Sequence, residues 1–95
     1  MTLQQLKYVV TVARTGSMSE ASKELFISQP GLTTSIRELE TEMGIKIFTR
    51  TNKGVVTSNE GERFLGYARQ VLEQASLLEG CLLYTSPSPR DRSLS

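Results

Sequence analysis

The stretch "FISQPGLTTSIRELE", residues 26–40, decides which fold the chain is expected to adopt. It runs from Ser-Gln-Pro through three more hydroxyl residues before it takes on the Ile-x-x-Leu spacing of an amphipathic helix. Ser28 suits an N-terminal cap, and Pro30 is tolerated in the first turn because its missing N–H would have no partner there. A helix that only packs against a core needs few short polar groups at its front. We therefore expect this front to enter a polar partner.

Two shorter helices are predicted before this stretch. The first has about three turns and ends at Thr15-Gly16, because Gly is the usual residue just beyond a helix C-terminus. Ser17 and Glu20 have the spacing of a capping box that begins the second helix. The expected buried residues are Leu3, Leu6, Val9, Val10 and Ala13 in the first helix, and Met18, Ala21 and Leu25 in the second.

The third helix is expected to run from Ser28 to Gly44, and a β-hairpin is expected to follow it. Apolar residues recur in this helix at spacings of four, three and four. After Gly44 the period changes to that of strands, in 45–50 and 55–58, separated by the turn sequence "TNKG". The buried residues expected on the third helix are Leu32, Ile36, Leu39 and Met43.

A fourth helix is predicted over residues 58–79, with Thr57 and Glu60 as its capping box. Its apolar stripe is longer than a small three-helix core can cover. One interpretation is a core helix that lies across the domain; the other, which we favour, is a dimerisation helix. The residues assigned to the subunit contact are Phe64, Ala68, Val71, Leu72, Ala75 and Leu78.

Composition restricts the class of function. The chain has 95 residues, no His and one Cys, so we expect neither an enzyme nor a metal or other cofactor. The sequence has no apolar run near the ~20 residues that span a bilayer, and its start does not resemble a signal peptide, so we expect a cytoplasmic protein without membrane contact. The net charge is only +1, but Lys46, Arg50 and Lys53 follow one another with no acid between them. Such a local basic segment suits an anionic partner.

The end of the chain, "GCLLYTSPSPRDRSLS" at residues 80–95, changes character abruptly. One interpretation is a disordered Ser/Pro-rich terminus. We favour another, because residues 81–91 back-translate into a sequence like the transposon end and adapter of common sequencing libraries. On this hypothesis the genuine polypeptide ends near Glu79, and 80–95 form a non-native, disordered tail.

The order α-α-α-β-β predicts a mainly α, winged helix-turn-helix domain over residues 1–57, followed by the long linker or dimerisation helix. In this fold the recognition helix, residues 28–42, enters the major groove, and the basic wing, residues 46–56, meets the flanking backbone or minor groove. A glutamine can pair with an adenine edge, and threonine methyl groups can meet a thymine methyl. The side chains expected to contact DNA are Ser28, Gln29, Thr33, Thr34, Arg37, Arg50 and Lys53.

Each of these residues also has a purely structural interpretation. Ser28 can be only a cap, the threonines can form a solvated helix face, and Arg37 can be a surface charge. Arg50 and Lys53 can simply discourage edge pairing of a two-stranded sheet. A winged helix used for protein contact is the second functional hypothesis, and an enzyme is the third.

The segment from Leu3 to Gly61 closely resembles the N-terminal DNA-binding domain of LysR-type transcriptional regulators, and the resemblance covers residues 2 to about 79. Its most specific parts are Gly16-Ser17, Ser28-Gln29-Pro30, Leu39-Glu40, Gly44 and Phe48-x-Arg50. The resemblance implies a homodimer held by the fourth helix, with two recognition helices on promoter DNA.

The same resemblance assigns the recognition role to matching positions and marks two departures. The positions are Ser28, Gln29, Pro30, Thr33, Thr34 and Arg37, with Arg50 and Lys53 in the wing. Gly31 stands where the family usually has Ala, and Thr33 where it commonly has Ser, so the target sequence stays open. The effector-binding domain of the family is absent from this chain. The related molybdate-responsive regulators share this domain and remain an alternative.

Overall fold

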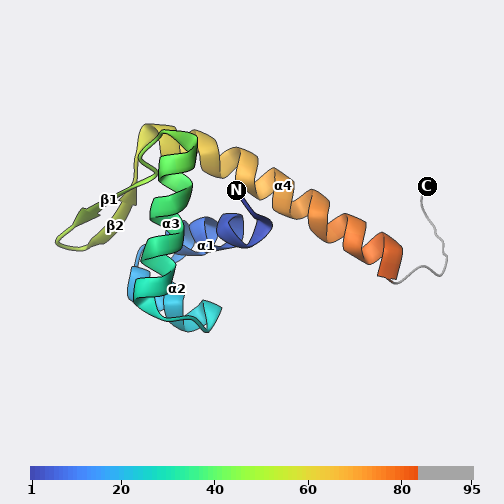
Figure 1. The fold of residues 1–95 in the computed structure, drawn as a ribbon, viewed down its shortest axis with the longest axis horizontal. Helices are drawn as coiled ribbons and strands as arrows, with labels where there is room; N and C mark the ends of the chain where they lie inside the picture. Colours follow the sequence, from blue (N-terminus) through green and yellow to red (C-terminus); the bar gives the residue numbers. More distant parts are fainter. Residues whose placement is uncertain (84–95) are drawn as a thin grey trace.

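The computed structural model describes residues 1–83, and these form the predicted order of three helices, a hairpin and a long helix (Figure 1). The elements are α1 (Leu3–Thr15), α2 (Met18–Leu25), α3 (Gln29–Met43), β1 (Phe48–Thr51), β2 (Gly54–Thr57) and α4 (Asn59–Leu83). The first three helices pack together, the hairpin projects to one side, and α4 extends away on the other (Figure 1). The mainly α, winged helix-turn-helix fold is therefore confirmed.

Helix α1 is capped at both ends by residues next to it in the sequence. Thr2 and Gln5 form a complete capping box, which the sequence analysis did not identify. Gly16 ends the helix in the left-handed conformation, as predicted. The buried face consists of Leu6, Val9 and Val12, whereas Leu3 is exposed. The predicted stripe was thus wrong at Leu3, which is 47% exposed, and it did not include the buried Val12.

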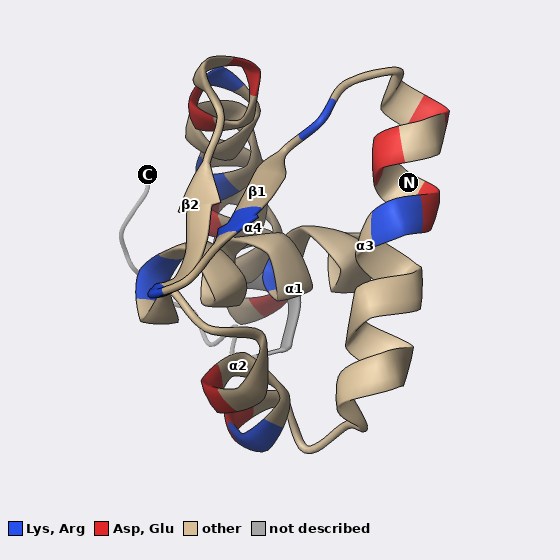
Figure 2. Cartoon of the chain, turned by 90° about the vertical axis from the view of Figure 1, so that its left-hand side faces the viewer, with Lys and Arg blue, Asp and Glu red and all other residues tan. Residues whose placement is uncertain are grey.

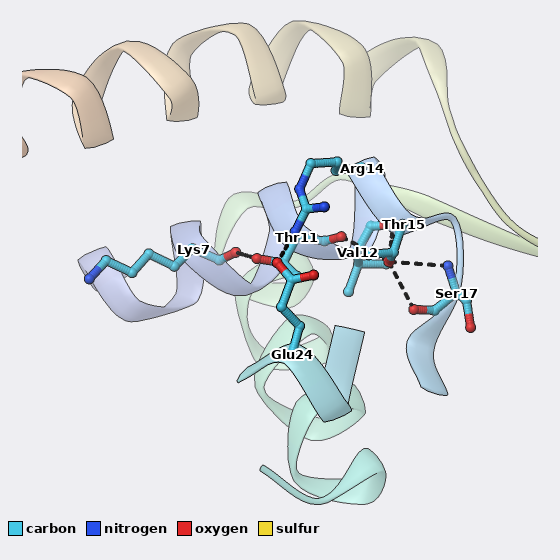
Figure 3. A network of polar contacts seen from close by, with 7 residues as sticks. All are labelled: Lys7, Thr11, Val12, Arg14, Thr15, Ser17 and Glu24. Carbon is cyan, nitrogen blue, oxygen red and sulfur yellow. Dashed lines mark hydrogen bonds and ion pairs between the residues drawn. The ribbon is translucent and has the colours of Figure 1, made fainter. Parts of the chain in front are cut away.

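The turn from α1 to α2 is held by the Thr15 side chain (Figure 3). Its hydroxyl donates to the carbonyl oxygens of Thr11 at 2.9 Å and Ser17 at 3.1 Å. The Ser17 hydroxyl accepts from the Glu20 N–H at 3.2 Å, as a cap should. The Ser17 N–H, however, donates to Thr15 Oγ1, so only half of the predicted capping box forms. An ion pair between Arg14 and Glu24 joins α1 to α2 across this turn (Figure 3).

The turn from α2 to α3 contains Phe26 with a φ of 60°, which is a left-handed conformation unusual for a bulky residue. The next residue, Ile27, is half-buried against the core, and its N–H donates to the Ser22 carbonyl oxygen. Ser28 then caps α3 by accepting from the Gly31 N–H at 3.1 Å. The predicted start of the recognition helix is confirmed.

The core face of α3 consists of Leu32, Ile36 and Leu39, each at most 2% exposed. Met43 was expected to continue this face but is 42% exposed, so this prediction was wrong. Gly44 stops the helix in the left-handed conformation, as predicted.

The hairpin is shorter than predicted, and its strands pair antiparallel with Phe48 opposite Thr57 and Thr51 opposite Gly54. Gly54 has a φ of 133°, and a Cβ added there would lie 2.5 Å from the Gly16 carbonyl oxygen. That oxygen accepts from the Val55 N–H at 3.1 Å. The wing is therefore attached to the α1–α2 turn through backbone atoms that approach too closely for any side chain.

Helix α4 begins one residue later than the predicted capping box requires. Ser58 provides the cap by accepting from the Gly61 N–H at 2.9 Å, whereas Thr57 is the last residue of β2. The predicted box of Thr57 and Glu60 is therefore wrong. A Cβ at Gly61 would lie 2.3 Å from the Ile47 carbonyl oxygen, so α4 can pack against the loop before β1 only with Gly at this position.

The helix continues to Leu83, so the expectation of a disordered tail over 80–95 is wrong for 80–83. The rest of the expected tail, 84–95, lies outside the described residues.

Candidate nucleic-acid interface

The front of α3 is polar, exposed and uncharged. Ser28, Gln29, Pro30 and Thr34 are exposed, and Thr33 is half-buried. In Figure 2 the first turns of α3 carry neither red nor blue, whereas acids gather in its last turns. The free N–H groups of a helix N-terminus carry a partial positive charge, and this front has no acid to cancel it. This end of α3 is therefore suited to approach an anionic surface.

Three elements bring their polar groups together beside this front. One shallow groove is lined by Gln29 of α3, Arg50 of β1, and the residues Ser17 and Ser19 at the start of α2. In the sequence, the first and last of these residues, Ser17 and Arg50, are more than thirty positions apart. The tertiary structure thus joins the predicted recognition helix and the predicted wing in one continuous surface.

The start of α2 is a part of this surface that the sequence analysis missed. Ser17 and Ser19 line the same groove as Gln29 and Arg50. Their signal in the sequence was the capping pattern, which we interpreted only as a helix start. The Thr15 contacts and the link from Gly16 to the wing hold this segment in place.

Arg37 lies one turn behind Thr33 and Thr34 and is exposed. The glutamates that follow Arg37 in α3 differ in their burial and their partners. Glu38 and Glu42 are exposed, and Glu42 pairs with the Met1 amino group at 2.5 Å. Glu40, by contrast, is half-buried and has a structural partner in the wing.

The partner of Glu40 is the backbone at the beginning of β1. One carboxylate oxygen, Oε2, accepts from the Ile47 N–H at 2.7 Å and from the Phe48 N–H at 3.1 Å. Ile47 and Phe48 are themselves buried, at 0% and 5% exposure. Glu40 therefore connects the back of α3 to the wing.

The wing presents its charges to solvent. Arg50 lies in β1 and Lys53 in the turn between the strands, and both are exposed. Blue segments mark the wing in Figure 2. Val56 of β2 is also exposed, at 51%, and was not expected at a polar surface.

The apolar residues of α4 divide into two groups. Ala68 is 2% exposed, and half-buried Phe64 packs against the core cluster, so both contact their own domain. Leu72 and Ala75 are half-buried. Over residues 59–80, the large apolar side chains exposed by more than two fifths are Tyr67, Val71, Leu77 and Leu78, of which Tyr67 and Leu77 were not predicted. Within residues 1–83, α4 and the other helices are too short or too polar to cross a membrane.

Comparison with known proteins places this geometry in a family. Residues 3–62 match the model of the bacterial regulatory helix-turn-helix protein family lysR. The HTH-type transcriptional regulator TfdT of Cupriavidus pinatubonensis (strain JMP 134 / LMG 1197) is 46% identical over 72 residues, which are 76% of this chain and 32% of TfdT. TcbR of Pseudomonas sp. (strain P51), also an HTH-type transcriptional regulator, is 39% identical over 79% of this chain and 26% of its own length. The chain thus spans about a third or less of these relatives.

Solved structures agree with this assignment. A CbnR_DBD–DNA complex superposes with a TM-score of 0.82 and 35% identity, over 87% of this chain and 95% of that one. A complex of BenM_DBD with benA site 1 DNA superposes with a TM-score of 0.84 and 32% identity, over 90% of this chain and 100% of that one. Both share the winged helix-turn-helix with a long final helix. The chain belongs to the LysR family and is the DNA-binding domain of a LysR-family transcriptional regulator.

Proposed function

We propose that this domain reads promoter DNA with the front of α3 in the major groove and the wing, residues 46–56, on the flanking backbone or minor groove. The observation that carries this proposal is the single groove lined by Gln29, Arg50 and Ser17. A recognition helix and a wing can act on one duplex only if their polar ends face the same side. Binding of DNA in the bacterial cytoplasm, and not catalysis, is the activity that this surface supports.

Within this interface we assign different roles to Gln29 and Lys53. The exposed Gln29 amide is at the first helical position, where a bidentate pairing with an adenine edge is geometrically suitable. Lys53 lies in the wing turn, where a cation meets phosphates without distinguishing bases. Pro30, Thr33 and Thr34 complete the front, with Thr methyl groups available to a thymine methyl. Ser28 has its hydroxyl engaged as the cap.

The assignment is tested by selection of duplexes from a random library with two variants, each at two salt concentrations. Gln29→Ala should relax the preference at one base position and cost about 1–3 kcal/mol on the selected site. Lys53→Ala should weaken binding to all duplexes by about the same factor and reduce the salt slope by about one. Both residues are exposed, so neither variant should change the melting temperature noticeably. An unchanged sequence logo for Gln29→Ala would move base reading to Thr33, Thr34 and Arg37.

We also propose that the domain acts as a homodimer through α4, within the range 58–79 predicted from the sequence. The supporting observation is the apolar row of Tyr67, Val71 and Leu78, which recurs at spacings of four and seven and remains exposed. Phe64 and Ala68 were assigned to this contact from the sequence, but their burial in the domain core leaves them little surface to offer a second chain. Leu72 and Ala75 stand at the edge of the proposed seam.

Sedimentation of Leu78→Glu and Glu79→Gln tests the proposed seam. Leu78→Glu should shift the protein toward monomer, because it places a charge in an apolar contact. Glu79→Gln lies next to it and should leave the association unchanged. A dimer of undiminished strength in Leu78→Glu would exclude this face of α4 from the interface.

A further inference from the structure

A second groove lies behind the front of α3, where its last turns face the loop before β1 and the first turn of α4. Arg37 and Thr41 line it from α3, Lys46 from the loop, and Glu60 from α4. Glu40 also borders it. The Lys46 backbone is held in place because the Ser58 hydroxyl donates to its carbonyl oxygen.

The groove contains two cations and two carboxylates, and these groups differ in the partners they already have. Glu40 already accepts two backbone N–H groups at one oxygen, which draws its carboxylate toward β1. Within residues 1–83 neither Arg37 nor Lys46 forms an ion pair. Two exposed cations therefore share the groove with one hydroxyl group, and the carboxylate of Glu60 stands at its α4 wall.

This groove continues the surface that the front of α3 presents. Thr33, Arg37 and Thr41 follow one another at spacings of four, so they share one face of the helix. That face begins beside Gln29 and ends at Lys46. A duplex that receives the front of α3 in its major groove brings one of its strands past the back of the same helix.

We propose that this groove holds a backbone phosphate of the bound duplex, with the Arg37 guanidinium, the Lys46 ammonium and the Thr41 hydroxyl as donors. The inference rests on the proposed function and refines it. It makes Lys46 and Thr41 DNA-contact residues, and it makes Arg37 a residue that positions the helix on the backbone. A phosphate contact of this kind carries no base preference.

The test compares Lys46→Ala and Arg37→Ala with the unmutated chain on a fluorescent duplex of random sequence and on a duplex selected by that chain. Each variant should weaken both complexes by a similar factor. Each should also reduce the slope of log affinity against log salt by about 0.9, the value for one phosphate contact. The base motif selected from a random library should stay unchanged in both variants.

Two matched controls and one opposite variant sharpen the comparison. Lys7→Ala and Arg69→Ala remove the same charges from α1 and α4, outside the groove, and should leave the slope almost unchanged. Glu60→Gln removes the opposing carboxylate and should strengthen binding, although it loses an acid from the first turn of α4. A purely structural role of Glu60 predicts no such gain.

The outcomes separate this inference from the proposed function. If the unmutated chain shows no salt-dependent duplex binding, the proposed function itself fails. If it binds but the slope of Lys46→Ala equals that of the unmutated chain, the phosphate site is wrong while the function stands. A changed base motif in Arg37→Ala would likewise overturn the inference and make Arg37 a base-reading residue.

Discussion

Replacement of Glu40 by alanine should destabilise this domain far more than replacement of the neighbouring acids. Its Oε2 accepts from the N–H groups of Ile47 at 2.7 Å and Phe48 at 3.1 Å. Both donors belong to buried residues, so in Glu40→Ala they lose their partner where water has little access. Hydrogen bonds to a charged group contribute about 1.5–3 kcal/mol each, and water that enters beside the half-buried side chain recovers a part. We expect a net loss of about 2–4 kcal/mol.

Glu40→Gln separates the acceptor from the charge. An amide oxygen in the position of Oε2 has two lone pairs and can accept from both N–H groups. Charge-assisted hydrogen bonds are roughly twice as strong as neutral ones, so this variant should lose only about 1–2 kcal/mol. Glu38→Ala is the matched control, because Glu38 is exposed on the same helix and forms no hydrogen bond or ion pair within residues 1–83.

Urea unfolding followed by circular dichroism measures these differences, and amide exchange locates them. In a domain of this size 1 kcal/mol corresponds to roughly 4–8 °C in Tm, so Glu40→Ala should melt well below the control. The amides of Ile47 and Phe48 should exchange faster in Glu40→Ala than in Glu40→Gln. If Glu40→Ala unfolds within about 0.5 kcal/mol of Glu38→Ala, the carboxylate does not hold the wing and the reasoning is refuted.

Three further substitutions have definite expected outcomes. Gly61→Ala should destabilise by about 1–3 kcal/mol or more, because the new Cβ would lie 2.3 Å from the Ile47 carbonyl oxygen. A Tm near that of the unmutated chain would show that α4 can shift at little cost. Gly54→Ala should disturb the wing more than the core, seen as selective broadening of wing signals in NMR spectra, since its Cβ would lie 2.5 Å from the Gly16 carbonyl oxygen. Phe26→Gly should raise the free energy of unfolding by up to about 1 kcal/mol, because glycine adopts the left-handed conformation without strain and the 93% exposed phenyl ring buries little surface. A lower Tm would mean that Phe26 makes a stabilising contact absent from the structure.

The sequence alone predicted the order of elements and most of their ends. Ser17, Ser28, Gly16 and Gly44 act as caps and stops in the structure as they were interpreted in the sequence. These caps could be identified because each bonds to a backbone group only three or four residues away. The polar front of α3 was predicted for the same reason, since it is a property of one helix. The box at Thr57 and Glu60 failed because Thr57 pairs in β2 and Ser58 provides the cap.

Tertiary structure alone decided which of several similar residues face the core. Leu3 and Met43 fit their helical stripes, yet they are 47% and 42% exposed, because a side chain on a stripe is buried only where another element lies against it. In α4, Phe64 and Ala68 belong to the core whereas Val71 and Leu78 face solvent. The spacing of apolar residues determines which side of a helix is apolar. How much of that side is buried depends on where the other helices and strands lie.

The same distinction holds for the functional surface. Gln29 and Arg50 could each be identified from their own segments, but their common groove with Ser17 depends on how the wing attaches to the α1–α2 turn. The role of Glu40 could not be predicted, because nothing in a sequence shows that an acid on one helix will meet two N–H groups seven and eight residues later. Local periodicity encodes the parts of this protein, whereas contacts between distant backbone atoms determine how those parts form one interface.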